Sequence, residues 1–175
     1  MSGTRQLAAI LFADIQSFTR LMEEDETNAN LLREKMKNSV ERNVEAHNGR
    51  LLKISGDGVM CTFNSAIEAV KAGIEIQKEM LQAPVVPLRI GIHEGDVIFE
   101  DGDAFGDGVN IASRIESFAL AGGVFFSGKI YDDIKNQADI HTVSLGKYEL
   151  KNVNPAIEIY AINSDGLIVP GKEKL

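Results

Sequence analysis

The sequence predicts an α+β domain with a mixed or antiparallel sheet, and three observations lead to this fold class. Apolar runs of strand length alternate with longer segments whose apolar residues recur at helical spacing. The turn Ser55-Gly56-Asp57-Gly58 separates two of the short runs, and an Asp-Gly pair in this position is typical of a β-hairpin. With 175 residues, of which 44% are hydrophobic, the chain has the size of one domain with its own core.

The first part of the chain is expected to contain one strand and two helices. Residues 7–13 form a nearly continuous apolar run, which favours a central strand covered on both faces. A short helix is expected to begin near Gln16-Ser17. Residues 26–47 predict a longer helix, which Asn48-Gly49 ends because both residues tolerate left-handed backbone angles. Its apolar positions recur at four-residue steps: Leu32, Met36, Val40 and Val44.

The predicted hairpin is followed by a helix. Residues 50–54 and 59–63 are its two strands, on either side of the Asp-Gly turn. Residues 66–81 then predict a helix that ends before Pro84, because proline cannot continue a helix.

The segment after this helix predicts a second pair of strands. Apolar side chains alternate with others over residues 88–93, which indicates a half-buried strand. After Gly95, residues 97–99 are expected to return as a separate strand, and residues 100–103 to form an acidic loop.

The last predicted helix, over residues 108–118, has two distinct faces. Asn110 and Arg114 are four positions apart, so their side chains share the polar face, opposite the apolar one. Further strands are expected over residues 124–126, 143–150 and 157–162. The predicted domain therefore spans residues 1–163, and the polar residues 164–175 are expected to be a tail or a linker within a longer protein.

Composition excludes several classes of protein. The net charge of −8 and the pI of about 4.9 argue against a nucleic-acid-binding protein. No apolar run is long enough to span a bilayer, and the first five residues do not resemble a secretory signal. The single cysteine, Cys61, cannot form an internal disulfide, so a cytoplasmic protein, or a cytoplasmic domain of a longer one, is expected.

Two carboxylates lie at the ends of predicted strands. Asp14 closes the first apolar run, and Asp57 lies in the hairpin turn. As a pair they match the preference of Mg²⁺ for one or two carboxylates plus substrate phosphates. Taken singly, Asp14 has a second explanation as a helix cap, and Asp57 as an ordinary turn aspartate.

Several further groups suit a phosphate ligand, although each has a simpler explanation. The backbone N–H groups of Phe18 and Thr19 at a helix start attract phosphate, as those of most helix starts do. Lys53, Arg114 and Lys151 are cations, and cations on strands, helices and loops are most often solvated surface residues.

Two apparent motifs are rejected. Residues 123–129 begin like a phosphate-binding P-loop, but Ile130 stands where the magnesium-binding hydroxyl belongs. Residues 101–106 begin like a calcium loop, but Phe105 and Ala112 replace required ligands. The scattered histidines form no zinc motif, and no serine lies in a Gly-x-Ser-x-Gly elbow.

Taken together and in order, the motifs resemble the class III nucleotidyl cyclase catalytic domain. The resemblance covers residue 7 to about residue 162. It rests on these segments: Phe12 to Thr19, Lys53 to Gly58, Arg89 to His93, Asp103 to Arg114, Leu145-Gly146 and Leu150-Lys151. It implies a ferredoxin-like βαββαβ core with additional strands and helices.

The resemblance also implies an activity, that of an adenylate cyclase converting ATP to 3′,5′-cyclic AMP and pyrophosphate. Asp14 and Asp57, helped by the Ile15 carbonyl, would hold two Mg²⁺ or Mn²⁺ ions. One ion would activate the ribose 3′-hydroxyl for in-line attack on the α-phosphorus, and the other would neutralise the departing pyrophosphate.

The remaining residues would bind the nucleotide. Lys53 and Asp103 would read adenine, and Asn110 would orient the ribose. Arg114 would meet the charge on the α-phosphate. The triphosphate contacts would come from the Phe18 and Thr19 N–H groups and from Lys151.

The family works as a head-to-tail dimer with sites at the interface. One subunit gives the metal-binding acids, and the other gives the purine-reading and transition-state residues. This chain contains both sets, so a homodimer with two equivalent sites is implied. Two alternatives stay open: a guanylate cyclase, and a catalytically silent cyclase-like module for dimerisation or sensing. The sequence leaves undetermined the regulator, any regulatory domain of a longer parent protein, the metal preference and the dimer affinity.

Overall fold

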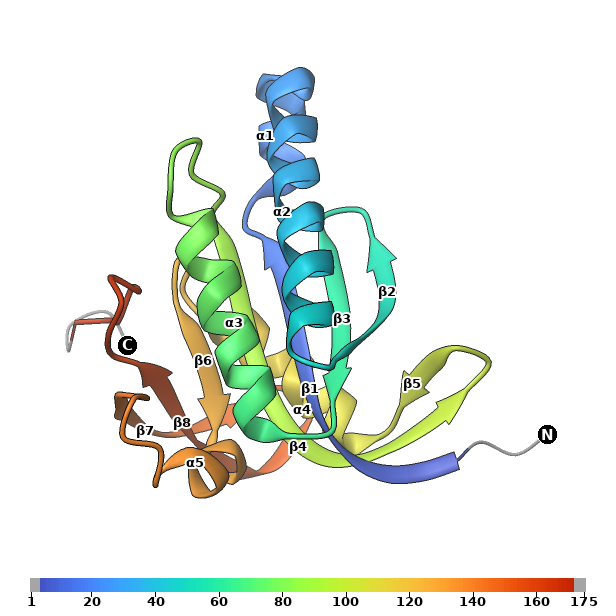
Figure 1. Cartoon of the computed structure of the whole chain (residues 1–175), viewed down its shortest axis with the longest axis vertical. Helices are drawn as coiled ribbons and strands as arrows, with labels where there is room; N and C mark the ends of the chain where they lie inside the picture. The colour runs from blue at the N-terminus through green and yellow to red at the C-terminus, as the bar shows by residue number, and fades with distance from the viewer. Residues whose placement is uncertain (1–3, 172–175) are drawn as a thin grey trace.

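The computed structural model describes residues 4–171, and over this range an eight-stranded sheet carries five helices (Figure 1). The strands are β1 (Thr4–Ile15), β2 (Arg50–Ser55), β3 (Gly58–Phe63), β4 (Leu88–Glu100), β5 (Asp103–Phe105), β6 (Val124–Ser127), β7 (Thr142–Leu150) and β8 (Val153–Ile162). The helices are α1 (Phe18–Glu24), α2 (Glu26–Ala46), α3 (Ala66–Met80), α4 (Asp107–Phe118) and α5 (Gly128–Ile134).

The strand order confirms the predicted α+β class. The sheet runs β2-β3-β1-β4-β6-β8-β7, and the short β5 pairs with β4. The first four strands are antiparallel, lie in the order β2-β3-β1-β4 and are connected by helices after β1 and after β3, which is the ferredoxin-like βαββαβ arrangement. The parallel pairing of β4 with β6 makes the whole sheet mixed.

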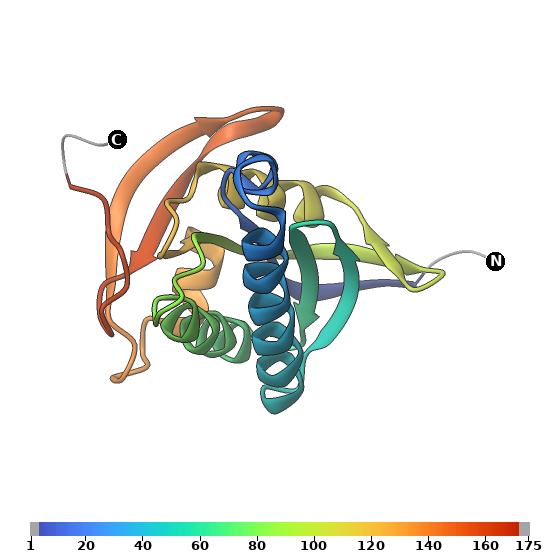
Figure 2. The same cartoon turned by 90° about the horizontal axis from the view of Figure 1, so that it is seen from above.

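Helices cover both faces of the sheet (Figure 2). Helices α2 and α3 lie on one face, and α4 lies on the other. Because side chains alternate along a strand, Ala9, Leu11 and Ala13 of β1 enter the core under α2 and α3, whereas Ile10 packs on the α4 side. Ile10, Phe12 and Asp14 are alternate residues of β1 and share one face of the sheet, so the side chain of Asp14 lies on the α4 face.

Strand β4 follows the same alternation. Leu88, Ile90 and Ile92 are fully buried in the core under α2 and α3, so Arg89 faces α4. In the register of the sheet, Arg89 lies directly opposite Asp14 of β1. The pairing of the two strands therefore brings a cation and an acid together, near the end of β1 and the start of β4.

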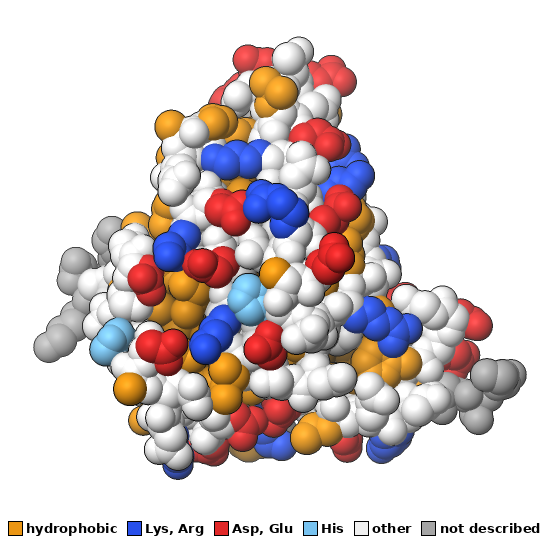
Figure 3. Space-filling model, in the orientation of Figure 1, with side chains coloured by type: hydrophobic (Ala, Val, Ile, Leu, Met, Phe, Trp, Pro, Cys, Tyr) orange, Lys and Arg blue, Asp and Glu red, His pale blue; other side chains and the backbone are white. Residues whose placement is uncertain are grey.

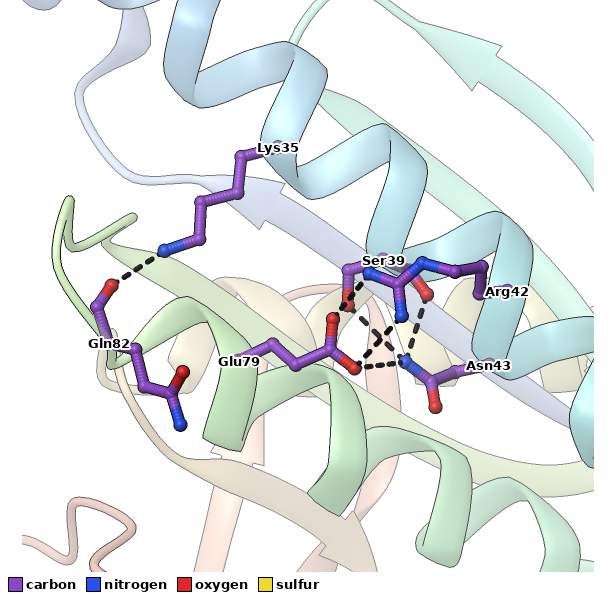
Figure 4. Close-up of polar contacts among 6 residues, drawn as sticks. All are labelled: Lys35, Ser39, Arg42, Asn43, Glu79 and Gln82. Carbon is purple, nitrogen blue, oxygen red and sulfur yellow. Dashed lines mark hydrogen bonds and ion pairs between the residues drawn. The ribbon is translucent and has the colours of Figure 1, made fainter.

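Polar contacts at the outer surface join α2 to α3 (Figure 4). Arg42 donates to both carboxylate oxygens of Glu79, at 2.6 and 3.4 Å, and Asn43 Nδ2 donates to Glu79 Oε2 at 3.1 Å. Lys35 Nζ donates to the carbonyl of Gln82 at 2.6 Å. Acidic and basic side chains are interspersed over this face, and no single basic surface stands out there (Figure 3).

Two expectations about strands are wrong. Residues 97–99 are not a return strand, because β4 continues without a break through Gly95 to Glu100, and β5 is the strand that returns. Gly95 does not break the strand because it pairs with Ala8, and its missing side chain lets Gly108 of α4 approach. Leu7, expected inside a covered run, is 58% exposed.

The end of the described chain packs against the domain. The N–H of Ile168 donates to the carbonyl of Gly122 at 2.9 Å, and Leu167 is buried. The segment expected to be a tail is therefore in contact with the domain as far as Ile168, and residues 172–175 lie outside the described range.

Cys61 of β3 is fully buried in the core under α2 and α3. Burial raises the pKa of its thiol to about 12, so the reactive thiolate is disfavoured at neutral pH. No helix among residues 4–171 is both long and apolar enough to cross a bilayer.

Candidate active site

A cavity of about 250 Å³ brings the two predicted metal acids together, and we call it the acid cavity. Asp14 reaches it from the end of β1, and Asp57 reaches it from the β2–β3 turn. The turn is held against β1, because the N–H of Ile15 donates to the carbonyl of Asp57 at 2.9 Å. The remaining lining residues are Phe12, Ala13, Lys53, Ser55, Gly58, Val59, Met60, Ser113 and Glu116.

Asp14 does not cap a helix. The residue that precedes α1 is Ser17, which has left-handed backbone angles and makes no capping hydrogen bond through its side chain. The carboxylate of Asp14 instead binds Arg89, whose Nε donates to Oδ1 and whose Nη2 donates to Oδ2, both at 3.0 Å. This bidentate contact raises the pKa of the Arg89 guanidinium, so the guanidinium stays charged at neutral pH.

Glu116 of α4 is the third acid of this cavity. Its side chain is 9% exposed, and its Oε2 lies 3.4 Å from Arg89 Nη2 without a hydrogen-bond partner. Burial, followed by the charge of Asp14, raises the pKa of Glu116 to about 8, although Arg89 opposes the shift. Three carboxyl groups, those of Asp14, Asp57 and Glu116, therefore line the cavity, and the half-buried guanidinium of Arg89 lies next to it.

A second cavity of about 270 Å³ holds a different set of predicted residues, and we call it the arginine cavity. Asn110 and Arg114 reach it from one face of α4, as their spacing predicted, and Lys151 reaches it from the β7–β8 turn. Ser113 lines both cavities, so α4 runs between them. The remaining lining residues are Asn152 and Val153.

Of the other predicted site residues, Phe18, Thr19 and Asp103 line neither cavity, whereas Lys53 lines the acid cavity. Phe18 and Thr19 begin α1, where the first backbone N–H groups of a helix lack partners within the helix. Asp103 begins β5 and lines neither cavity; its Oδ1 accepts from the N–H of Ala104 at 2.8 Å. Lys53 lines the acid cavity and not the arginine cavity, so within one chain it lies with the metal acids.

The acid cavity suits a divalent cation that arrives with a nucleotide. Among residues 4–171, no cluster of three His, Cys, Asp or Glu side chains is arranged to hold a metal by itself. Asp14 and Asp57 supply carboxylate oxygens, the ligands that Mg²⁺ and Mn²⁺ prefer, and phosphates and water complete such sites. The buried Oε2 of Glu116, which has no hydrogen-bond partner, is a further carboxyl oxygen in the same cavity.

A larger cavity of about 440 Å³ lies at the start of α4 and contains none of the predicted site residues. His93 lines it, and its Nδ1 lies 2.7 Å from Ser127 Oγ. Burial, followed by the charge of Lys129, lowers the pKa of His93 to about 4, so the ring is neutral at pH 7. The chemistry of the side chains, rather than cavity size, identifies the acid cavity as the better candidate.

Sequence reasoning missed two residues that lie close to Asp14: Glu116, which lines the acid cavity, and Arg89, which binds Asp14. Arg89 was assigned only to a strand, and Glu116 to the end of a helix. Their proximity to Asp14 depends on the register that places Asp14 opposite Arg89 and on the packing of α4 over β4. The available signal was the position of Arg89 in an apolar strand, where a cation on a covered face needs an acidic partner.

Comparison with known proteins identifies relatives across nearly the whole chain. The sequence profile of the family "Adenylate and Guanylate cyclase catalytic domain" matches residues 2–164. A Rhizobium meliloti protein named "Putative adenylate cyclase 3" is 41% identical over 164 residues, which is 89% of this chain and 28% of that protein. The chain thus spans less than a third of the length of this relative.

Two solved structures have the same fold. A crystal structure named as an adenylate/guanylate cyclase/hydrolase from Silicibacter pomeroyi is 30% identical, with a TM-score of 0.80 over 93% of this chain and 99% of that one. The adenylyl cyclase CyaB from P. aeruginosa is 26% identical, with a TM-score of 0.81 over the full length of both chains. With the family profile matched over residues 2–164, these likenesses show that the chain belongs to the adenylate and guanylate cyclase catalytic domains, the class III nucleotidyl cyclases.

Proposed function

We propose that this domain is an adenylate cyclase that converts ATP to 3′,5′-cyclic AMP and pyrophosphate at sites shared by two copies of the chain. The observation that carries the proposal is the separation of the acid cavity from the arginine cavity within one chain. Each cavity has a volume below the roughly 300–1,000 Å³ that is usual for a small-molecule site. These volumes support a nucleotide site that combines the acid cavity of one subunit with the arginine cavity of its partner.

Each set of residues has a distinct task in this proposal. Asp14, Asp57 and the Ile15 carbonyl would hold two Mg²⁺ or Mn²⁺ ions, and these would supply activation of the attacking hydroxyl and neutralisation of the leaving group. Asn110 of the other subunit orients the ribose, and Arg114 stabilises the negative charge that grows on the α-phosphate. The triphosphate is bound by Lys151 and by the N–H groups of Phe18 and Thr19 at the start of α1.

Selection of the purine is assigned to Lys53 and Asp103. Lys53 donates to a ring nitrogen of adenine, and Asp103 accepts from the adenine amino group. Guanine reverses this pattern of donors and acceptors, so both residues disfavour GTP. The 41% identity to a protein named as an adenylate cyclase supports the same choice. The family also includes guanylate cyclases, so GTP is the competing substrate.

A product assay tests the proposal. The purified chain is incubated with ATP or GTP, each with Mg²⁺ or Mn²⁺, and cyclic nucleotides are separated by chromatography. We expect cyclic AMP in large excess over cyclic GMP. We also expect Lys53→Glu to lower kcat/KM for ATP by at least about ten-fold, because a hydrogen bond to the base is lost and a repulsion is added. Equal turnover of both nucleotides would contradict the substrate assignment.

The catalytically silent module is the remaining alternative. Asp14, Asp57, Asn110 and Arg114 are all present and line the two cavities, which favours an active enzyme. A dimer that forms no cyclic nucleotide under any of the four conditions would favour the silent module.

A further inference from the structure

Arg89 contacts the same carboxylate that is proposed to bind a metal ion, that of Asp14. Both carboxylate oxygens of Asp14 accept from this guanidinium, at 3.0 Å each. The two side chains are 23% and 24% exposed, so water screens the pair only in part. A cation that binds Asp14 therefore competes with Arg89 for these two oxygens.

The structure also contains an acceptor for the displaced guanidinium. Nη2 of Arg89 lies 3.4 Å from Oε2 of Glu116, an atom without a hydrogen-bond partner. Nη1 of the same guanidinium donates to the carbonyl of Ser117 at 3.3 Å, beside Glu116 on α4. One end of the guanidinium already contacts α4, so a small rotation toward Glu116 exchanges one carboxylate partner for another.

We propose that Arg89 is a positioning residue. Its guanidinium binds the Asp14 carboxylate while no metal is bound, and it rotates to bind Glu116 when a divalent cation binds Asp14. The inference rests on the proposed role of Asp14 as a metal ligand. Arg89 keeps the three acids of the cavity from repelling one another in the metal-free protein. Glu116 keeps the half-buried guanidinium from losing its acidic partner once Asp14 binds the metal ion.

Two substitutions are expected to change metal affinity in opposite directions. Arg89→Gln removes the competing cation, so the protein should bind Mn²⁺ about ten-fold more tightly, because a positive charge next to a ligand oxygen is lost. Glu116→Gln removes the alternative partner and leaves Arg89 on Asp14, so Mn²⁺ should bind several-fold more weakly. The dissociation constant is measured on the nucleotide-free protein at pH 8, from the electron paramagnetic resonance signal of free Mn²⁺.

The double variant separates the transfer of Arg89 from a simple effect of charge. If Glu116 acts through Arg89, Glu116→Gln should leave Mn²⁺ affinity unchanged in the Arg89→Gln background. The same weakening in both backgrounds would show that Glu116 acts directly on the metal, and it would overturn the proposal. An Arg89→Gln protein that binds Mn²⁺ no more tightly than the unmodified chain would also overturn it.

Controls keep the result interpretable. Arg89→Lys retains the charge without the bidentate contact, so its affinity for Mn²⁺ should fall between those of the unmodified chain and Arg89→Gln. This variant provides the test if Arg89→Gln does not fold.

Asp14→Asn separates failure of the proposed function from failure of the Arg89 transfer. If Asp14→Asn leaves Mn²⁺ affinity unchanged, Asp14 is not a metal ligand and the proposed function fails. If Asp14→Asn weakens binding but the Arg89 and Glu116 variants do not diverge, only the transfer fails.

Discussion

Gly91 of β4 lies directly beneath the backbone of Glu116 in α4. A Cβ built on Gly91 would collide with the backbone nitrogen of Glu116 and would lie 2.6 Å from its Cα. Backbone atoms cannot move aside as the end of a side chain can, so only glycine permits this approach of helix and strand. The contact fixes how far α4 lies from the sheet. It therefore also positions Asn110 and Arg114, which lie on the same helix.

Gly91→Ala should therefore destabilise the domain. Overpacking of this kind costs about 1–3 kcal/mol, and we expect the free energy of unfolding in urea to fall by that amount. Gly128→Ala is the matched control, because the nearest atom to its added Cβ is 3.8 Å away. An equal loss of stability in both variants would show that the contact of Gly91 with the Glu116 backbone does not cause the loss.

Arg114→Ala should lower kcat strongly while the fold is kept. Loss of one preorganised group that stabilises charge in the transition state commonly reduces turnover by about a hundred-fold or more. The control is Lys147→Ala, which removes an exposed positive charge from β7, outside both cavities. Full activity of the Arg114 variant in a cyclic AMP assay would remove Arg114 from the proposed mechanism.

The shared site predicts that two inactive variants restore each other. Asp14→Asn and Arg114→Ala should each be inactive alone, whereas a mixed dimer of the two contains one site with both sets intact. At equal concentrations and random pairing, half of the dimers are mixed, so about a quarter of the unmodified activity is the expected maximum. Subunit exchange is checked with differently tagged chains. Proven exchange without recovered activity would argue against sites built from two subunits.

His93 should make stability depend on pH. Its pKa is lowered to about 4 in the folded protein, from 6.5 in a free histidine, so the unfolded chain binds a proton first. The stability from the neutral ring is complete above pH 6.5 and is lost as the pH falls toward 4, by about 2 kcal/mol between pH 7 and pH 5. His93→Asn should lose this dependence, as measured by urea unfolding at both pH values.

A variant of an exposed histidine, His141→Asn, is the control for that measurement. It should keep the pH dependence of the unmodified chain. If His93→Asn and the unmodified chain lost the same free energy between pH 7 and pH 5, other groups would be responsible.

The sequence predicted the elements that are specified locally. The hairpin follows from its Asp-Gly turn, and the two faces of α4 follow from the four-residue spacing of Asn110 and Arg114. The separate return strand at residues 97–99 was wrong because Gly95 indicated a turn, whereas the structure uses it for close packing of β4 against Gly108. Helix α5 was missed because it has only seven residues and starts with glycine.

The candidate site was predictable only as far as its residues carry recognisable motifs. Asp14 and Asp57 were expected to act together, and they line one cavity. Arg89 and Glu116 were not expected there, because their meeting with Asp14 depends on the pairing of two strands distant in sequence and on the position of a helix above them. Their roles, like those of the other site residues, stay predictions until the variants are tested.

The burial of Cys61 has a practical use. Because the chain contains no other cysteine and this thiol is fully buried, a cysteine introduced at the surface would be the one site open to a maleimide dye or spin label. Probes placed in turn on β5 and on α1 would report distances between two copies of the chain with the native residue at position 61 left in place. The proposed dimer is thus open to spectroscopy without prior removal of a core side chain.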